Sequence, residues 1–121
     1  MEALLDSSFI ISCIRNRIDF LSQLEEQGFK VKVPKEVLEE LKELRKSSKI
    51  SHEDRIAIDV ALEMFEHRKV KRITLGYKNV DEGLIVRGKE GYYIATLDGE
   101  IKNKVPKKIV IFRSKESIGV E

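Results

Sequence analysis

The sequence is short of the residues that build disulfides or zinc sites. It contains one cysteine, Cys13, and two histidines, His52 and His67. A lone cysteine cannot form an internal disulfide, which fits a reducing compartment. These three residues also cannot supply a zinc site of the usual ligand number and spacing. Any metal that this chain binds must therefore be held by oxygen.

Long apolar runs are missing as well. No stretch reaches the roughly 18 apolar residues of a membrane helix, and no basic N-terminus leads into an apolar segment with a cleavage site. We therefore expect a soluble, cytoplasmic protein with no membrane partner. Internal repeats, long linkers and low-complexity segments are absent too, so the 121 residues predict a single domain, 1–121.

A strong net charge is the third absence. The 23 basic and 21 acidic residues leave +2, which does not by itself indicate nucleic-acid binding. The charges are distributed less evenly. The segment from Gly99 to Lys115 contains six basic residues and a single acidic one, Glu100. A second basic group comprises Arg68, Lys69, Lys71 and Arg72. Each group is explained equally well by a solvated surface and by a surface that contacts phosphate.

Short apolar runs alternate with helical patterns along the chain, which is typical of a parallel sheet wrapped by helices. We expect strands at about 3–5, 29–33, 70–75, 92–96 and 108–112. Helices are expected at about 7–18, 20–27, 34–46, 51–68, 79–91 and 98–105. The predicted fold class is α/β, a three-layer α/β/α sandwich with a central parallel sheet of about five strands.

Three aspartates lie where predicted strands end or the adjoining helices begin. Asp6 follows the first strand, Asp98 follows the most apolar strand, and Asp81 opens the helix before that strand. In open parallel sheets, ligands bind outside the carboxyl ends of the strands. Helix capping explains each aspartate equally well on its own. Carboxylates that meet at one edge, however, repel one another unless a cation or a shared proton compensates.

The helix expected at 34–46 carries a fourth candidate. Its inward stripe comprises Val37, Leu38, Leu41 and Leu44. At 100° per residue, Glu40 lies about 90° from the centre of that stripe, at the border of the buried face. The other three glutamates lie about 130–170° away and are expected to be solvated; they are Glu36, Glu39 and Glu43.

A site made of oxygen ligands alone suits Mg²⁺ or Mn²⁺, which share their coordination with substrate phosphate. On a phosphodiester, such ions activate water and stabilise the developing negative charge. The residues therefore point to metal-dependent chemistry on phosphodiesters.

Four blocks of the sequence resemble the PIN-domain family, in order and at family spacing over nearly the whole chain. They are LLDSSFI at 4–10, VPKEVLEEL at 33–41, VDEGL at 80–84 and YIATLDGEI at 93–101. The last two look closest to small archaeal PIN proteins and to rRNA-processing PIN nucleases. The resemblance implies a Mg²⁺- or Mn²⁺-dependent endoribonuclease. Its catalytic and metal-binding acids would be Asp6, Glu40, Asp81 and Asp98.

The resemblance also assigns supporting positions. Ser7 and Thr96 would orient a carboxylate or contact phosphate, whereas Glu82 and Glu100 match acids whose roles vary in the family. Gly99 stands where the family often has a larger polar or basic residue, a departure that concerns a substrate contact rather than the metal. The RNA backbone would be held by a nearby basic stretch through salt-sensitive contacts: Lys102, Lys104, Lys107 and Lys108.

Several functions stay open at this point. A nuclease could be a toxin neutralised by an antitoxin protein, or a maturation enzyme for structured RNA, which the adjacent Asp81 and Glu82 favour; homodimers are common among both. A PIN domain that binds RNA or protein without cutting is the alternative. Phosphoryl transfer to Asp6, as in receiver domains or phosphatases, is disfavoured because Ser8 stands where the phosphatase pattern has a second aspartate.

Overall fold

A six-stranded sheet forms the centre of the structure, a computed structural model that describes residues 1–121. The strand order is β3-β2-β1-β4-β5-β6. The strands are β1 (Glu2–Leu5), β2 (Lys30–Pro34), β3 (Lys71–Ile73), β4 (Tyr93–Ala95), β5 (Lys108–Phe112) and β6 (Ser117–Val120). Strands β1 to β5 are parallel to their neighbours, which confirms the predicted sheet, whereas β6 pairs antiparallel with β5.

The sixth strand was not predicted because the turn before it has no glycine, asparagine or proline. The chain leaves β5 through a short 3₁₀-helix, η1 (Arg113–Lys115), and reverses at Glu116, whose φ of 49° is left-handed. Glycine or asparagine normally occupies such a conformation. A glutamate there gives no sign of a hairpin in the sequence.

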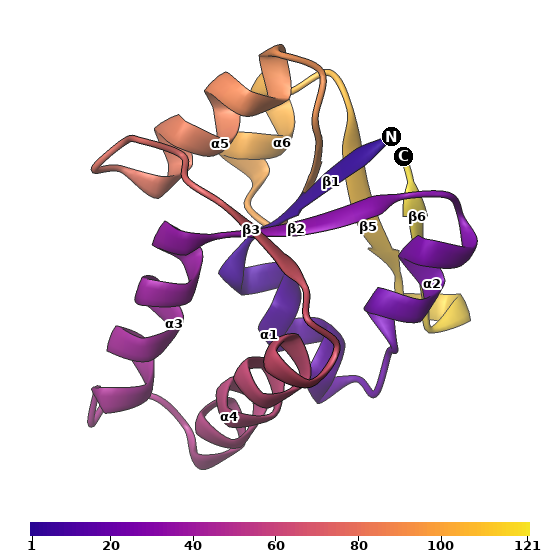
Figure 1. Cartoon of the computed structure of the whole chain (residues 1–121). Coiled ribbons are helices and arrows are strands. Elements are labelled where there is room, and N and C mark those ends of the chain that lie inside the picture. The colour runs from indigo at the N-terminus through magenta and orange to yellow at the C-terminus, as the bar shows by residue number, and fades with distance from the viewer.

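Six helices cover the two faces of the sheet (Figure 1). They are α1 (Ser7–Arg15), α2 (Phe20–Glu26), α3 (Lys35–Lys46), α4 (His52–His67), α5 (Val80–Lys89) and α6 (Gly99–Lys104). Helices α1 to α4 lie on one face, and α5 and α6 lie on the other. The predicted three-layer arrangement is therefore confirmed. None of the helices is both long and apolar enough to cross a membrane.

The core is divided by the sheet into a large and a small part. Alternate residues of a strand point to opposite faces, so Ala3 and Leu5 enter the large part while Leu4 enters the small one. The large part holds 20 buried residues under α1 to α4, and the small part holds 6 under α5 and α6. Both faces of β1 are thus buried, as expected for a central parallel strand.

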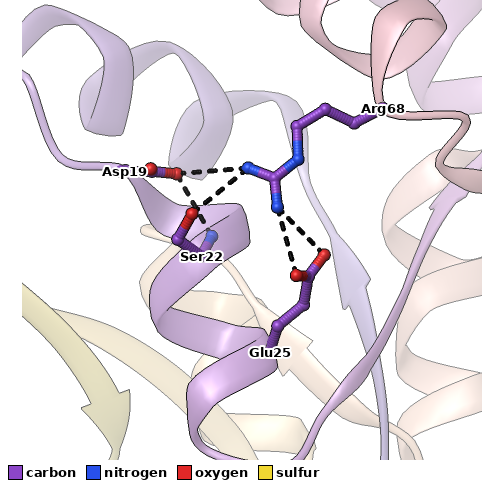
Figure 2. Close-up of polar contacts among 4 residues, drawn as sticks. All are labelled: Asp19, Ser22, Glu25 and Arg68. Carbon is purple, nitrogen blue, oxygen red and sulfur yellow. Dashed lines mark hydrogen bonds and ion pairs between the residues drawn. The ribbon is translucent and has the colours of Figure 1, made fainter.

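Helix α2 is attached to the end of α4 by one arginine (Figure 2). The Arg68 guanidinium donates to both carboxylate oxygens of Glu25, each at 3.1 Å, and to Ser22 Oγ at 3.2 Å. Its Nη1 also lies 3.6 Å from Asp19 Oδ1. Because Asp19 caps α2 through the Ser22 N–H, the arginine holds the start of α2 as well as its side.

The outer edge of β6 is covered by two side chains, Gln23 of α2 and Gln27 directly after it. Gln27 Nε2 donates to the carbonyl of Ile118 at 2.9 Å, and the Ile118 N–H donates to Gln23 Oε1 at 3.0 Å. Both backbone groups of this residue are therefore satisfied by amide side chains in place of a further strand. These are the two glutamines of the chain.

Candidate active site

Asp6 lies at the carboxyl end of β1, in the middle of the sheet. Its backbone is extended and its side chain caps α1 by accepting the Ser7 N–H at 2.8 Å. The second carboxylate oxygen accepts the Thr96 hydroxyl at 2.6 Å. Only 5% of Asp6 is exposed, and Thr96 is fully buried. The sequence folds this way because an aspartate is a favoured helix cap directly after an apolar strand.

Glu40 reaches the same place from α3. The Ser7 hydroxyl donates to Glu40 Oε1, so α1 and α3 meet beside Asp6. Glu40 is half-buried, whereas Glu39 and Glu43 are exposed. The helical angle thus correctly predicted that Glu40 is less exposed than Glu39 and Glu43.

Asp98 follows β4, the strand next to β1. Its N–H donates to Thr96 Oγ1 at 3.1 Å, and its carboxylate caps α6 by accepting the Glu100 N–H at 2.8 Å and the Ile101 N–H at 3.3 Å. The Thr96 hydroxyl therefore donates to the carboxylate of Asp6 and accepts the backbone N–H of Asp98. A threonine between the two strand ends fixes the positions of both aspartates.

Asp81 is in the first turn of α5 and is exposed. The cap of this helix is Asn79, whose side chain accepts the Glu82 N–H at 3.1 Å. Asp81 is therefore not needed as a cap. Glu82 is exposed beside it, and Glu100 is exposed in the first turn of α6.

The pKa values of two of these carboxyls show that the acidic groups interact. Burial raises the pKa of Asp6 above its ordinary value; hydrogen bonds from Thr96 and Ser7 oppose the rise, and the charges of Glu40 and Asp81 add to it. Burial also raises the pKa of Asp81, with further contributions from Asp98 and Glu100. Each predicted acid therefore acts electrostatically on at least one other.

The acidic residues do not form a ready-made cage. No group of three or more histidine, cysteine, aspartate or glutamate side chains comes close enough to hold a metal ion among them. The direct contacts are instead pairwise and run through hydroxyls, from Glu40 to Ser7 and from Asp6 through Thr96 to Asp98. The side-chain atoms here that could coordinate a metal ion are all oxygens.

The predicted basic stretch starts beside these acids and then leads away from them. Lys102 lies one helical turn after Asp98, whose carbonyl accepts the Lys102 N–H at 3.0 Å. Lys107 and Lys108 lie at the start of β5, where Lys108 is level with Ile94 of β4. Lys107 Nζ lies 5.2 Å from the centre of the Tyr93 ring, and Lys108 Nζ donates to the carbonyl of Lys102 at 2.8 Å. Lys102 and Lys104 occupy the last turn of α6.

Sequence reasoning missed the role of Glu36. We expected a solvated side chain, but its carboxylate accepts the N–H groups of Leu75 at 3.0 Å and Gly76 at 2.9 Å. Partial burial opposes the change, yet these two bonds hold the pKa of Glu36 below its ordinary value. The loop that leads to α5 and Asp81 is thereby tied to α3. Backbone donors leave no mark in the sequence, so no signal could have identified this pair.

Comparison with known proteins identifies the family. The sequence model of the PIN domain matches residues 3–116. Ribonuclease VapC4 from Methanocaldococcus jannaschii is 28% identical over 105 residues, which cover 83% of this chain and 79% of that protein. The solved structure of the PIN domain endonuclease Utp24 matches with a TM-score of 0.75 at 20% identity. The match covers 99% of this chain and 90% of the Utp24 chain, and it shows the same fold. Because the family model spans nearly the whole sequence, this chain belongs to the PIN-domain family.

Proposed function

We propose that this chain, acting as one domain, is an endoribonuclease that hydrolyses RNA phosphodiesters with the help of Mg²⁺ or Mn²⁺. The observation that carries the proposal is the linked arrangement of Asp6, Thr96 and Asp98 at the ends of two adjacent central strands. A relative whose name is ribonuclease supports RNA as the substrate.

The residues present fit a divalent cation. The donor set is oxygen alone, and repulsion among the carboxylates contributes to the raised pKa of Asp6 and Asp81, a repulsion that a cation would remove. Mg²⁺ usually keeps several of its waters and takes only one or two carboxylates, so it does not require a cage of three. Asp6 and Asp98 would hold the ion, and Glu40 and Asp81 would complete the site.

The chain's own groups would then perform distinct tasks. Thr96 holds the carboxylate of Asp6 and the backbone of Asp98, and Ser7 holds the carboxylate of Glu40. The carboxylate of Asp98 is held by the N–H groups of Glu100 and Ile101. The bound ion would supply positive charge and lower the pKa of water near the phosphorus. Glu40 and Asp81 would accept hydrogen bonds from the attacking water and so orient it in line with the leaving oxygen.

A cleavage assay tests the proposal. Purified protein is incubated with labelled single-stranded RNA in Mg²⁺ or Mn²⁺, and in EDTA. We expect cleavage that requires the ion and that Asp98→Asn reduces by at least about 100-fold, the usual cost of losing an electrostatic contact to the reacting phosphate. Cleavage by Asp98→Asn at the parent's rate would refute the assignment.

One observation favours a second candidate, a PIN domain that binds RNA or protein without cutting. No three acidic side chains surround a common point. The same assay separates the two functions, because this candidate predicts RNA retention in a gel shift with intact RNA in every divalent ion.

Two biological roles remain alternatives within the nuclease function. A toxin would be neutralised by an antitoxin protein, whereas a maturation enzyme would act on structured RNA. Expression of the chain in a bacterial host distinguishes them, since a toxin should arrest growth and Asp98→Asn should relieve the arrest.

A further inference from the structure

A polar cavity of about 560 Å³ lies along α1. Its lining includes Ser8, Ser12, Arg15, Asp54 and Arg113, and a single apolar side chain, Ile11. Such a lining is unlike the apolar pockets that hold most small organic ligands. Its chemistry instead suits a charged and strongly solvated group.

One end of the cavity, at Ser8, is linked to the acidic site by a hydrogen bond. Ser8 directly follows Ser7, and its hydroxyl oxygen accepts the N–H of Leu97, between Thr96 and Asp98, at 3.2 Å. Arg113 is the first residue after β5, and β5 is parallel to β4. The carboxyl ends of β1, β4 and β5 therefore bring Asp6, Asp98 and Arg113 to the same edge of the sheet.

The cavity continues away from the acids along one face of α1. Ser8, Ser12 and Arg15 follow one another at spacings of four and three residues, which places them on the same side of a helix. Arg15 follows Ser8 by seven positions, which corresponds to about 10 Å along the helix axis. A chain-like ligand that reaches Asp6 can therefore extend beside this face.

The charge in the cavity is positive. It contains two arginines and one aspartate. Arg15 Nη1 lies 3.0 Å from Asp54 Oδ1, and the Arg15 side chain is 48% exposed, so its other N–H groups face solvent. Arg113 is exposed and makes no ion pair or side-chain hydrogen bond.

We infer that this cavity binds a backbone phosphate of the RNA next to the bond that is cut, an inference that rests on the function proposed above. A phosphate approaching the carboxylates is repelled, and the positive charges of Arg113 and Arg15 in the adjoining cavity offset that repulsion. The planar guanidinium fork matches two phosphate oxygens. The hydroxyls of Ser8 and Ser12 add neutral donors.

The salt dependence of RNA binding tests this site. Anisotropy of a fluorescein-labelled single-stranded RNA is measured in EDTA, so that the RNA stays intact, between about 50 mM and 200 mM salt. Each phosphate contact contributes about 0.7 to the slope of log K against log salt for a single strand. Arg113→Gln and Arg15→Gln should each weaken binding and lower the slope by about 0.7.

The matched control is Arg72→Gln. Arg72 is an exposed arginine without an ion pair on β3, at the other edge of the sheet. This change removes the same charge but should leave the slope nearly unchanged. A loss at Arg72 equal to the loss at Arg113 would mean that only the overall charge matters, and would overturn the inference.

A variant that is expected to tighten RNA binding distinguishes loss of the site from damage to the fold. Asp54→Asn removes the negative charge of the cavity and releases Arg15, so RNA binding should become tighter. A damaged fold would weaken it instead. Unchanged or weaker binding by Asp54→Asn, with an unchanged melting temperature, would also count against the site.

The two levels of proposal fail differently. If the parent chain neither binds nor cuts RNA in any divalent ion, the nuclease function is wrong and this phosphate site is wrong with it. If the parent cuts RNA in Mg²⁺ while Arg113→Gln and Arg15→Gln bind and cut as the parent does, the function stands and the phosphate site alone is refuted.

Discussion

At the scale of single residues, the carboxyl group of Asp6 is held in a place that favours its neutral form more than water does. Burial is the main cause of its raised pKa, and two hydrogen bonds do not fully offset it. A group of this kind costs stability wherever it is ionised. The position is explained by chemistry at the site rather than by stability of the fold.

Asp6→Asn should therefore raise the melting temperature in EDTA at neutral pH. The pKa of Asp6 is higher in the folded than in the unfolded state, so its favourable contribution is present below about pH 4 and is lost as pH rises through the folded-state value. The melting temperature of Asp6→Asn minus that of the parent should grow from about pH 4 upwards and then level off. Differential scanning calorimetry over a pH series measures it, and a difference that shrinks with rising pH would contradict the assignment.

Glu36 has the opposite character, because its charged form is bound by two backbone N–H groups. Glu36→Gln should lower stability by on the order of 1 kcal/mol. It should also slow RNA cleavage, since the loop that positions Asp81 loses its attachment to α3. Glu39→Gln, an exposed change on the same helix, is the control for both thermal melting and cleavage rate. Equal cleavage by the two variants would show that the loop is positioned by other contacts.

At the scale of elements, α5 lies unusually close to its neighbours. A Cβ atom at Gly88 would stand 2.6 Å from Val105 Cγ1, and one at Gly83 would stand 2.9 Å from Leu75 Cβ. Both glycines are buried. Gly88 is the penultimate residue of α5, and its close contact with Val105 leaves no room for a side chain there.

Gly88→Ala should consequently destabilise the protein. Alanine is favoured over glycine inside a helix by about 1 kcal/mol, but forcing an extra methyl into a packed contact costs typically about 1–3 kcal/mol. We expect a net loss on the order of 1 kcal/mol, seen as a lower urea midpoint. Gly99→Ala is the control, because nothing lies within 4 Å of a Cβ there, and it should be neutral or stabilising.

At the scale of the whole molecule, much of the arrangement could be predicted from the sequence. Runs of apolar residues located the five parallel strands, because buried central strands carry little else. Strand ends then located Asp6 and Asp98, and helical angles separated Glu40 from Glu39 and Glu43. These features depend on local patterns, which a sequence displays directly.

The rest depended on contacts between distant segments. Lys107 and Lys108 are close to Asp98 along the chain, yet α6 leads the chain back before β5 starts, so Lys108 pairs with Ile94, which precedes Asp98 on β4. Glu36 bonds backbone groups 39 and 40 residues away. Strand β6 follows a turn formed by a glutamate. None of these relations follows from the identity of neighbouring residues.

A divalent ion should stabilise the entire fold if it binds where four carboxylates act on one another. A ligand that binds only the folded state contributes about 2.7 kcal/mol at a hundredfold excess over its Kd. Mg²⁺ or Mn²⁺ should therefore raise the melting temperature of the parent in calorimetry or fluorescence melting. The rise should be absent in Asp98→Asn, and a rise of the same size in that variant would place the ion elsewhere.

Gln23 of α2 and Gln27 at its end have a consequence for how copies of the chain meet one another. An unpaired outer strand offers its backbone to any passing extended segment and so invites intermolecular sheet growth. Gln23 and Gln27 bond the outward N–H and carbonyl of Ile118, so these two groups are not free to pair with an incoming strand. Protection from aggregation at this border of the molecule therefore depends on two amides that belong to a neighbouring helix.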